Sequence, residues 1–182
     1  MLIQNLSKGR LLSRYAVLLI AVVIALTGAV APASAATTTA TVTDFYRIYK
    51  RTGGDHFHTA DNAEVVRAVT ALGYTYEGVG AKVSSTPASG LVPFYRIYRP
   101  GNGDHFHTTN WDEVISATTG AGYAYEGIAA YVYPAGSASG VPFYRLWHRG
   151  NGDHYHTKSW SEVLSATQQG YVYEGVGANV LG

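Results

Sequence analysis

The chain has 182 residues, no cysteine and 47% apolar residues, with a formal net charge of +1 at pH 7. This length allows one ordinary hydrophobic core, which has to be stable without disulfides. The charge near zero and the lack of a long basic run exclude a protein that binds nucleic acid by neutralising phosphates with Lys and Arg.

Residues 1–35 resemble an export signal. Basic residues up to Arg14 precede an uncharged run, and its apolar centre, AVLLIAVVIAL, is shorter than the ~20 residues that span a bilayer. Ala33-Ser34-Ala35 matches the small-x-small pattern that signal peptidase cleaves. We therefore predict a secreted chain with no membrane span after cleavage and ten Lys and Arg against twelve Asp and Glu. An uncleaved membrane anchor is the alternative.

After a lead-in at 36–44, the chain consists of three similar stretches. FYRIYKRTGGDHFHT, FYRIYRPGNGDHFHT and FYRLWHRGNGDHYHT begin at Phe45, Phe94 and Phe143, 49 residues apart. Each stretch later contains GYxYEG. A period of this length indicates repeats that cannot bury their apolar faces alone. We define unit 1 as 45–93, unit 2 as 94–142 and unit 3 as 143–182, within a single domain at 45–182.

Each unit is predicted to begin with a β-hairpin. FYRIY is rich in aromatic and β-branched residues, and Asn102-Gly103 is a typical hairpin-turn dipeptide. Asn151-Gly152 occupies the same place in unit 3, and Gly53-Gly54 in unit 1.

The hairpin register decides which side chains meet. A two-residue turn places Arg96 and Tyr98 on the same face as His105 and His107, whereas a three-residue loop places Asp104 with Arg96 instead. The sequence leaves both registers open.

A helix of about ten residues is predicted next. Its N-cap is Asp61, Asn110 or Ser159, and a glutamate follows three residues later, as in a capping box. Apolar residues recur at helical spacing until a glycine near the end of each helix. These glutamates, Glu64, Glu113 and Glu162, are therefore interpreted as capping partners rather than catalytic carboxylates.

The last part of each unit, such as YEGVGAKV, reads as one or two strands bent near the glycine. The predicted fold class is α+β, with three strand-strand-helix-strand(s) repeats. Because an open array of three units exposes large ends, we predict a closed pseudo-threefold ring, trefoil-like or propeller-like.

Six of the seven histidines lie in the three GDH[FY]HT motifs. Residues two apart on a strand share a face, so each His-x-His pair projects in one direction with the preceding aspartate on the other face. Such pairs are half of a zinc or copper site, or they hold hairpins together by hydrogen bonds. The candidate ligands are His56, His58, His105, His107, His154 and His156. No further regular ligand spacing occurs, so we predict neither a metal nor a cofactor.

The repeated arginines, Arg47, Arg96 and Arg145, lie between aromatic residues and are predicted to pair with carboxylates. Their candidate partners are the motif aspartates or Glu77, Glu126 and Glu174. A glycosidase needs two carboxylates in unlike environments, which three equivalent copies do not offer. GxSxG, HExxH and phosphate-binding GK[ST] motifs are missing from the sequence. Binding is therefore favoured over catalysis, and no catalytic residue is assigned.

The combination of YR[IL][YW], GDH[FY]xT and GYxYEG resembles an exported bacterial and fungal repeat family of unknown function, whose usual motif is close to YRLYN…GDHFYTT…GYxYEG. The resemblance covers Phe45 to about Val180. His58, His107 and His156 stand where that family tends to have tyrosine, which weakens the metal hypothesis. Members of the family often accompany hydrolase or peptidase domains, so the resemblance implies an accessory binding module.

The leading prediction is a secreted, monomeric carbohydrate-binding module or lectin for a cell-wall or environmental glycan. The predicted ligand-binding residues are Asp55, His56, Asp104, His105, Asp153, His154, Tyr49, Tyr98 and Trp147. Trp111 and Trp160 are further possible stacking platforms. The alternatives are a structural or protein-interaction domain whose Asp, His and Arg motif is buried, and a metal-binding protein or small metal-dependent hydrolase.

Overall fold

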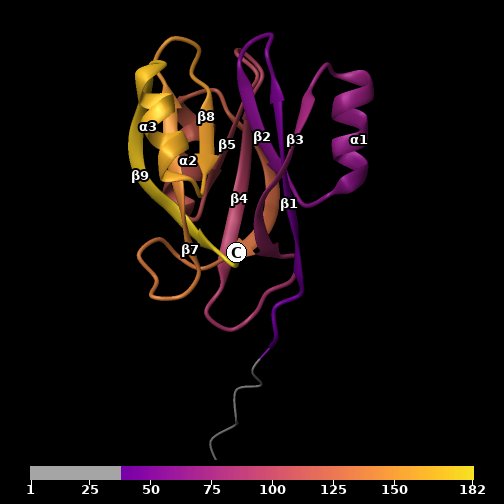
Figure 1. The fold of residues 1–182 in the computed structure, drawn as a ribbon, viewed down its shortest axis with the longest axis vertical. Coiled ribbons are helices and arrows are strands. Elements are labelled where there is room, and N and C mark those ends of the chain that lie inside the picture. The colour runs from indigo at the N-terminus through magenta and orange to yellow at the C-terminus, as the bar shows by residue number, and fades with distance from the viewer. Residues whose placement is uncertain (1–37) are drawn as a thin grey trace, which may run out of the picture. The chain divides into compact units, whose positions relative to one another are not determined.

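The computed structural model describes residues 38–182, so the predicted export signal lies outside the described residues. The described part is mostly β, with three helices that flank the strands (Figure 1). The elements in chain order are β1 Val42–Lys50, β2 Asp55–Thr59, α1 Asn62–Ala71, β3 Thr75–Ser84, β4 Val92–Arg99, β5 Asp104–Thr108, α2 Trp111–Gly120, β6 Ala124–Val132, β7 Val141–His148, β8 His154–Thr157, α3 Trp160–Gln168 and β9 Tyr171–Val180. Each unit has the predicted order, and its last part is one strand rather than two.

All strand pairs are antiparallel, in two sheets. A six-stranded sheet has the order β2-β1-β3-β6-β4-β5 and forms a nearly closed, barrel-like structure, while β8-β7-β9 form a separate sheet. The two halves of the larger sheet meet through a single pair, Ser84 with Tyr131. The short strands β2, β5 and β8 come from different units and contact one another.

The hairpin loops have four residues, because Arg99 pairs with Asp104 and Lys50 with Asp55. A loop of four residues, like one of two, places the same side chains of the two strands on the same face of the sheet. The structure therefore matches the first of the two predicted registers. Tyr98 accordingly lies opposite His105 and Arg96 opposite His107. The histidine pairs therefore share a face with the arginine and the aromatic residue of the preceding strand.

The predicted N-caps are confirmed, since the side chains of Asp61, Asn110 and Ser159 accept hydrogen bonds from the first helical turns. The second half of the predicted capping box is wrong. The backbone N–H of Asp61 donates to the Thr59 hydroxyl and not to Glu64, and Asn110 and Ser159 bond in the same way to Thr108 and Thr157. The threonine that ends each β2-type strand thus satisfies the cap and releases the glutamate for another contact.

The central core collects the first phenylalanine of each unit. Phe45, Phe94 and Phe143 are fully buried together with valines and alanines from β3, β6 and β9. Each helix also packs on its own hairpin, as where Val65 and Ala68 of α1 meet Ile48 and Phe57. Among the described residues, no helix is long and apolar enough to cross a membrane.

Candidate functional site

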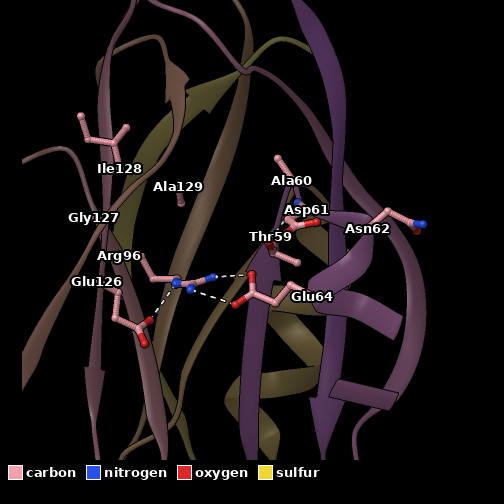
Figure 2. Close-up of a pocket in the computed structure, with 10 residues that line it drawn as sticks. All are labelled: Thr59, Ala60, Asp61, Asn62, Glu64, Arg96, Glu126, Gly127, Ile128 and Ala129. Carbon is pink, nitrogen blue, oxygen red and sulfur yellow. Dashed lines mark hydrogen bonds and ion pairs between the residues drawn. The ribbon is translucent and has the colours of Figure 1, made fainter. Parts of the chain in front are cut away.

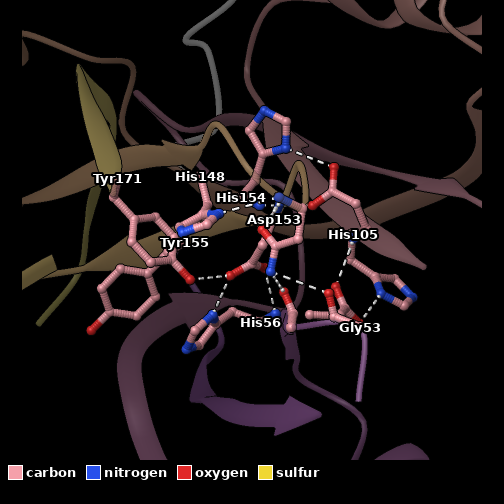
Figure 3. A network of polar contacts seen from close by, with 12 residues as sticks. Gly53, His56, His105, His148, Asp153, His154, Tyr155 and Tyr171 are labelled. Atoms are coloured by element: carbon pink, nitrogen blue, oxygen red, sulfur yellow. Dashed lines mark hydrogen bonds and ion pairs between the residues drawn. The ribbon is translucent and has the colours of Figure 1, made fainter. Parts of the chain in front are cut away.

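The motif aspartates bind histidines of another unit. Asp153 accepts hydrogen bonds from the backbone N–H of His56 at 2.7 Å and from its Nδ1 at 2.6 Å, as Figure 3 shows. Asp55 binds His105 in the same two-point manner, at 2.9 and 2.7 Å. Asp104 binds His154 at 2.7 Å in both bonds. The contacts thus run from unit 1 to unit 2, from unit 2 to unit 3 and back to unit 1.

Each aspartate also accepts a hydrogen bond from the tyrosine that begins the YxYEG segment of its own unit. The hydroxyls of Tyr74 and Tyr123 lie 2.5 and 2.6 Å from Asp55 and Asp104, and Tyr171 donates to Asp153. Burial, and then the neighbouring carboxylate, raise the pKa of all three tyrosines. The hydroxyls therefore remain protonated donors at any physiological pH.

The three aspartates are buried, at 1 to 3% exposure, and both oxygens of each carboxylate accept hydrogen bonds. One oxygen from each lies within 4.8 Å of the others, and this is the one group within residues 38–182 that is spaced to hold a metal ion. Since the oxygens already have N–H and O–H donors, the geometry is that of an internal hydrogen-bond network. The predicted ligand contacts of Asp55, Asp104 and Asp153 would require these bonds to break.

The histidines that bind the aspartates have a fixed orientation. A carboxylate can only accept hydrogen bonds, so Nδ1 of each ring carries a proton directed at the aspartate, and Nε2 is the ring nitrogen turned away from it. The His56 ring lies between Tyr49 at 4.3 Å and Tyr155 of unit 3 at 4.5 Å. The His105 ring lies likewise between Tyr98 at 4.6 Å and Phe57 of unit 1 at 4.4 Å.

The second histidine of each pair lies in the core. His58, His107 and His156 are about 1% exposed, and their ring centroids are 5.8 to 6.3 Å apart among the three core phenylalanines. Burial, followed by neighbouring cationic groups and other histidines, lowers their pKa values well below 6.5. These rings are therefore neutral core residues and do not approach a surface.

Besides the Asp–His hydrogen bonds, ion pairs of the repeated arginines also connect neighbouring units. Arg96 binds Glu126 of its own unit at 2.7 Å and Glu64 of unit 1 with two bonds of 2.9 and 3.0 Å (Figure 2). Of the two candidate sets of partners, the YEG glutamates are the correct one, since Arg47 and Arg145 lie 2.8 and 2.9 Å from Glu77 and Glu174. The motif aspartates bind histidines and tyrosines instead. The helix glutamates were missed as partners. The only sequence signal of these glutamates is their position three residues after the N-cap, and that spacing predicted a capping box rather than an ion pair with arginine.

These ion pairs change the protonation of the helix glutamates. Burial alone would raise the pKa of Glu162, but hydrogen bonds from Arg47, Thr157 and Tyr155 outweigh it and lower the pKa to about 2. The pKa of Glu64 is lowered for the same reason by Arg96 and Thr59. Both glutamates are therefore charged acceptors over the whole physiological range.

Two pockets of similar size open at two of the unit boundaries, with volumes of about 260 and 270 Å³. The first is lined at the boundary of units 1 and 3 by Tyr49, His56, Glu77, Tyr155, Glu162 and Tyr171. Corresponding residues line the second at the boundary of units 1 and 2: Tyr98, His105, Glu126, Phe57, Glu64 and Tyr74. We call these two pockets the boundary clefts.

The structure thus brings four of the predicted binding residues, Tyr49, His56, Tyr98 and His105, to the clefts. Trp147 pairs with His154 across β7 and β8 at the third boundary, and is half-buried. A larger pocket of about 410 Å³ lies on the other side of the Arg96 ion pairs, beside the start of α1. Figure 2 shows Arg96, Glu126 and Glu64 along its wall.

Comparison with known proteins identifies a family but no activity. Residues 44–181 match a family described as Domain of unknown function (DUF5648). No curated protein and no solved structure matches the chain. This agrees with the expected resemblance to an uncharacterised family.

Proposed function

We propose that this chain, which belongs to the DUF5648 family, is an exported carbohydrate-binding module that takes a neutral glycan of a cell wall or the environment. The observation that supports it is that corresponding residues of different units line boundary clefts of nearly equal volume, about 260 and 270 Å³. Each cleft combines an aromatic ring with a YEG glutamate, Glu77 or Glu126, whose ion pair with the arginine uses only Oε2. Aromatic rings offer a flat apolar surface to the C–H face of a sugar, and carboxylates accept hydrogen bonds from its hydroxyls.

The dimensions suit one ring-sized ligand in each cleft. Pockets for drug-sized molecules measure about 300 to 1,000 Å³, and the clefts lie just below that range. The buried Asp153 holds the His56 imidazole through Nδ1, which leaves Nε2 to form a hydrogen bond with a sugar hydroxyl. Tyr49 stacks on that imidazole, so the recognition groups are already rigid before a ligand arrives.

We further propose that the three repeats form a closed pseudo-threefold ring. In such a ring each boundary between units is built from corresponding residues, so the same kind of cleft occurs more than once. Three links between units support this arrangement. Ser84 pairs with Tyr131, Tyr133 exchanges two backbone hydrogen bonds with Asn179, and Lys82 exchanges two with Leu181 and Gly182. These links join unit 1 to unit 2, unit 2 to unit 3 and unit 3 to unit 1.

Several weak sites in one monomer make physical sense for a polymeric ligand. When two sites engage the same polymer, the second binding step is intramolecular, and avidity rises by about 10² to 10⁴ if the geometry allows both contacts. A module of this kind needs only modest affinity in each cleft.

A glycan array probed with the purified protein tests the proposal. We expect neutral oligosaccharides to bind, and the double variant Tyr49→Ala/Tyr98→Ala to lose at least about tenfold in affinity, or 1.4 kcal/mol. Tyr76→Ala is the matched control, because Tyr76 is an exposed tyrosine outside both clefts. An array without any binder, or a correctly folded double variant that binds as the wild type does, would refute the cleft proposal.

A structural or protein-interaction domain is the second candidate function. It is favoured by the burial of Asp55, Asp104 and Asp153 and by the internal hydrogen bonds of their carboxylates. If the domain is structural, the motif occurs three times in the chain because each of the three unit boundaries needs it for folding. A blank array together with a strong loss of stability on removing one aspartate would decide for this candidate.

A further inference from the structure

Two groups of three aromatic side chains lie outside the boundary clefts, at the start of α2 and α3. In unit 2, Trp111 lies 5.0 Å from Tyr95 and 5.4 Å from Tyr125 between ring centroids. In unit 3, Trp160 lies 5.2 Å from Tyr144 and 5.4 Å from Tyr173. We call these groups the aromatic trios.

The rings of the trios are held in fixed positions and are open to solvent. Trp111 meets Tyr125 edge to face at 87°, and Trp160 meets Tyr173 at 90°. Such contacts fix the plane of an indole ring. The tryptophans are nevertheless 46% and 48% exposed, so a large part of each ring has no partner within the described chain.

Folding does not require the tryptophan, because unit 1 lacks it. Asn62 begins α1 at the position of Trp111 and Trp160. The tyrosines of unit 1 are still arranged in the same way, with Tyr46 and Tyr76 6.2 Å apart at 61°, against 6.2 Å and 62° for Tyr95 and Tyr125. The helix has the same length of ten residues as α2 and the same kind of cap. The exposed tryptophans therefore need an explanation other than helix formation.

The residues beside the trios carry mixed and partly compensated charges. In unit 2, Asp112 follows Trp111, and Glu113 of the same helical turn is paired with Arg145. In unit 3, Glu162 is paired with Arg47, and Lys158 lies two residues before Trp160. Surroundings of this kind favour a neutral ligand over a polyanion, which needs a cluster of basic residues. Asp112 in unit 2 and Ser161 in unit 3 also stand directly after the tryptophan, where they supply polar groups for hydroxyls.

We propose that the two aromatic trios are stacking platforms for the pyranose rings of a neutral polysaccharide. The platforms are distinct from the boundary clefts: they would bind the C–H face of rings on the outside of an insoluble polymer, and there are two of them because unit 1 has asparagine. This inference extends the proposed carbohydrate binding to a second kind of site and names its ligand as a polymer surface.

The test is co-sedimentation of the protein with insoluble chitin and, separately, with cellulose. Comparing the two polymers shows which kind of pyranose ring the protein binds, N-acetylglucosamine in chitin or glucose in cellulose. We expect Trp111→Ala and Trp160→Ala each to weaken binding about tenfold and the double variant to abolish it. Asn62→Trp should create a third trio beside Tyr46 and Tyr76 and bind more tightly than the wild type. Tyr76→Ala is the matched control and should bind as the wild type does.

The outcomes separate the platforms from the clefts. The cleft variant Tyr49→Ala/Tyr98→Ala should still sediment fully with the polymer, because the platforms are intact. If it also binds the glycan array as the wild type does, the cleft proposal fails while the platform proposal stands. If the double tryptophan variant keeps its circular dichroism spectrum and still sediments as the wild type does, the platform proposal is overturned. Wild-type protein that sediments with neither polymer overturns it too, as does tryptophan-dependent binding to phosphatidylcholine vesicles in place of the polymers.

Discussion

The carboxylate of Asp104 accepts two hydrogen bonds of 2.7 Å from His154, which lies 50 residues further along the chain and in another unit. Because one bond comes from the backbone and the other from the ring, the carboxylate fixes both the strand β8 and the imidazole. The same aspartate accepts the Tyr123 hydroxyl from its own unit at 2.6 Å. One buried side chain therefore joins two units and sets the orientation of a histidine.

Replacing Asp104 by asparagine is expected to destabilise the protein by about 3 kcal/mol or more. The amide group would place N–H donors opposite the donors of His154 or Tyr123, and buried polar groups left unpaired cost about 1 to 3 kcal/mol each. Urea denaturation measures the change. Tyr123→Phe is the matched control, since it removes one hydrogen bond and should cost about 1 kcal/mol. Equal midpoints for the wild type and Asp104→Asn would contradict the structural role of this carboxylate.

Replacing Arg96 by lysine is expected to lower the stability by about 1 to 3 kcal/mol, although the charge is kept. Arg96 is mostly buried and binds Glu64 through two nitrogens and Glu126 through a third, a geometry that a single ammonium group cannot reproduce. The measurement is the free energy of unfolding in urea.

The control for Arg96 is Lys82→Ala. Lys82 pairs with Asp44 at the surface, with half of its side chain exposed, and surface pairs of this kind contribute about 0 to 1 kcal/mol. A loss for Arg96→Lys no larger than the loss for Lys82→Ala would show that the ion pairs between units are not important for stability.

Stability is expected to fall as the pH drops below about 6.5. His58, His107 and His156 have pKa values well below 6.5 in the folded protein, so below that pH the unfolded chain binds protons that the folded core does not. Each histidine contributes a slope of at most about 1.4 kcal/mol per pH unit, and the three together at most about 4. Glu162, whose pKa is lowered from 4.5 to about 2, adds to this loss of stability only below about pH 5.

Urea denaturation at pH 7.5 and pH 5 tests the role of these histidines, with His156→Phe as the matched variant. The Nε2 atom of His156 has no hydrogen-bond partner within the described chain, and phenylalanine has a similar shape. The difference in stability between this variant and the wild type should shift in favour of the variant between pH 7.5 and pH 5. The change of its unfolding free energy per pH unit should be about a third smaller than that of the wild type. An identical pH dependence for both proteins would mean that His156 is not a source of the acid sensitivity.

The local elements could be predicted from the sequence because their signals are local. The cap at Asp61, the helix end near Gly73 and the shared face of His56 and His58 each follow from residues a few positions apart. For Arg47 the sequence left the motif aspartates and the YEG glutamates open as partners, and the structure pairs it with Glu77 on the neighbouring strand of its own unit.

The contacts between units could not be predicted, because repeats with the same sequence give no sign of which copy a side chain reaches. Asp153 and His56 are 97 residues apart, and each unit contains its own Asp-His dipeptide that could have satisfied the motif. The two histidines of one pair also differ in burial. His58 lies among the core phenylalanines, whereas His56 lines a cleft, and spacing along the strand cannot distinguish them.

Substitution of Gly80 by alanine is expected to destabilise the protein, and the equivalent change at Gly177 to have little effect. A methyl group at Gly80 would lie 2.9 Å from Nε2 of His58, a buried ring that cannot move away, whereas at Gly177 the closest contacts are 3.3 Å. Overpacking of a core costs about 1 to 3 kcal/mol, against a gain of about 0.4 to 1 kcal/mol from a stiffer unfolded chain. At Gly80 the clash outweighs the gain, and at Gly177 the two nearly cancel.

Unit 2 provides the matched control for these glycines, because Ala129 already occupies the corresponding position of β6. Ala129→Gly should cost about 0.5 to 1 kcal/mol through backbone entropy alone. The three variants are compared by urea denaturation at pH 7.5, where the core histidines are neutral in both states. If Gly80→Ala proves as stable as Gly177→Ala, then the His58 ring is free to shift, and close packing against that ring is not what requires glycine at position 80 of β3.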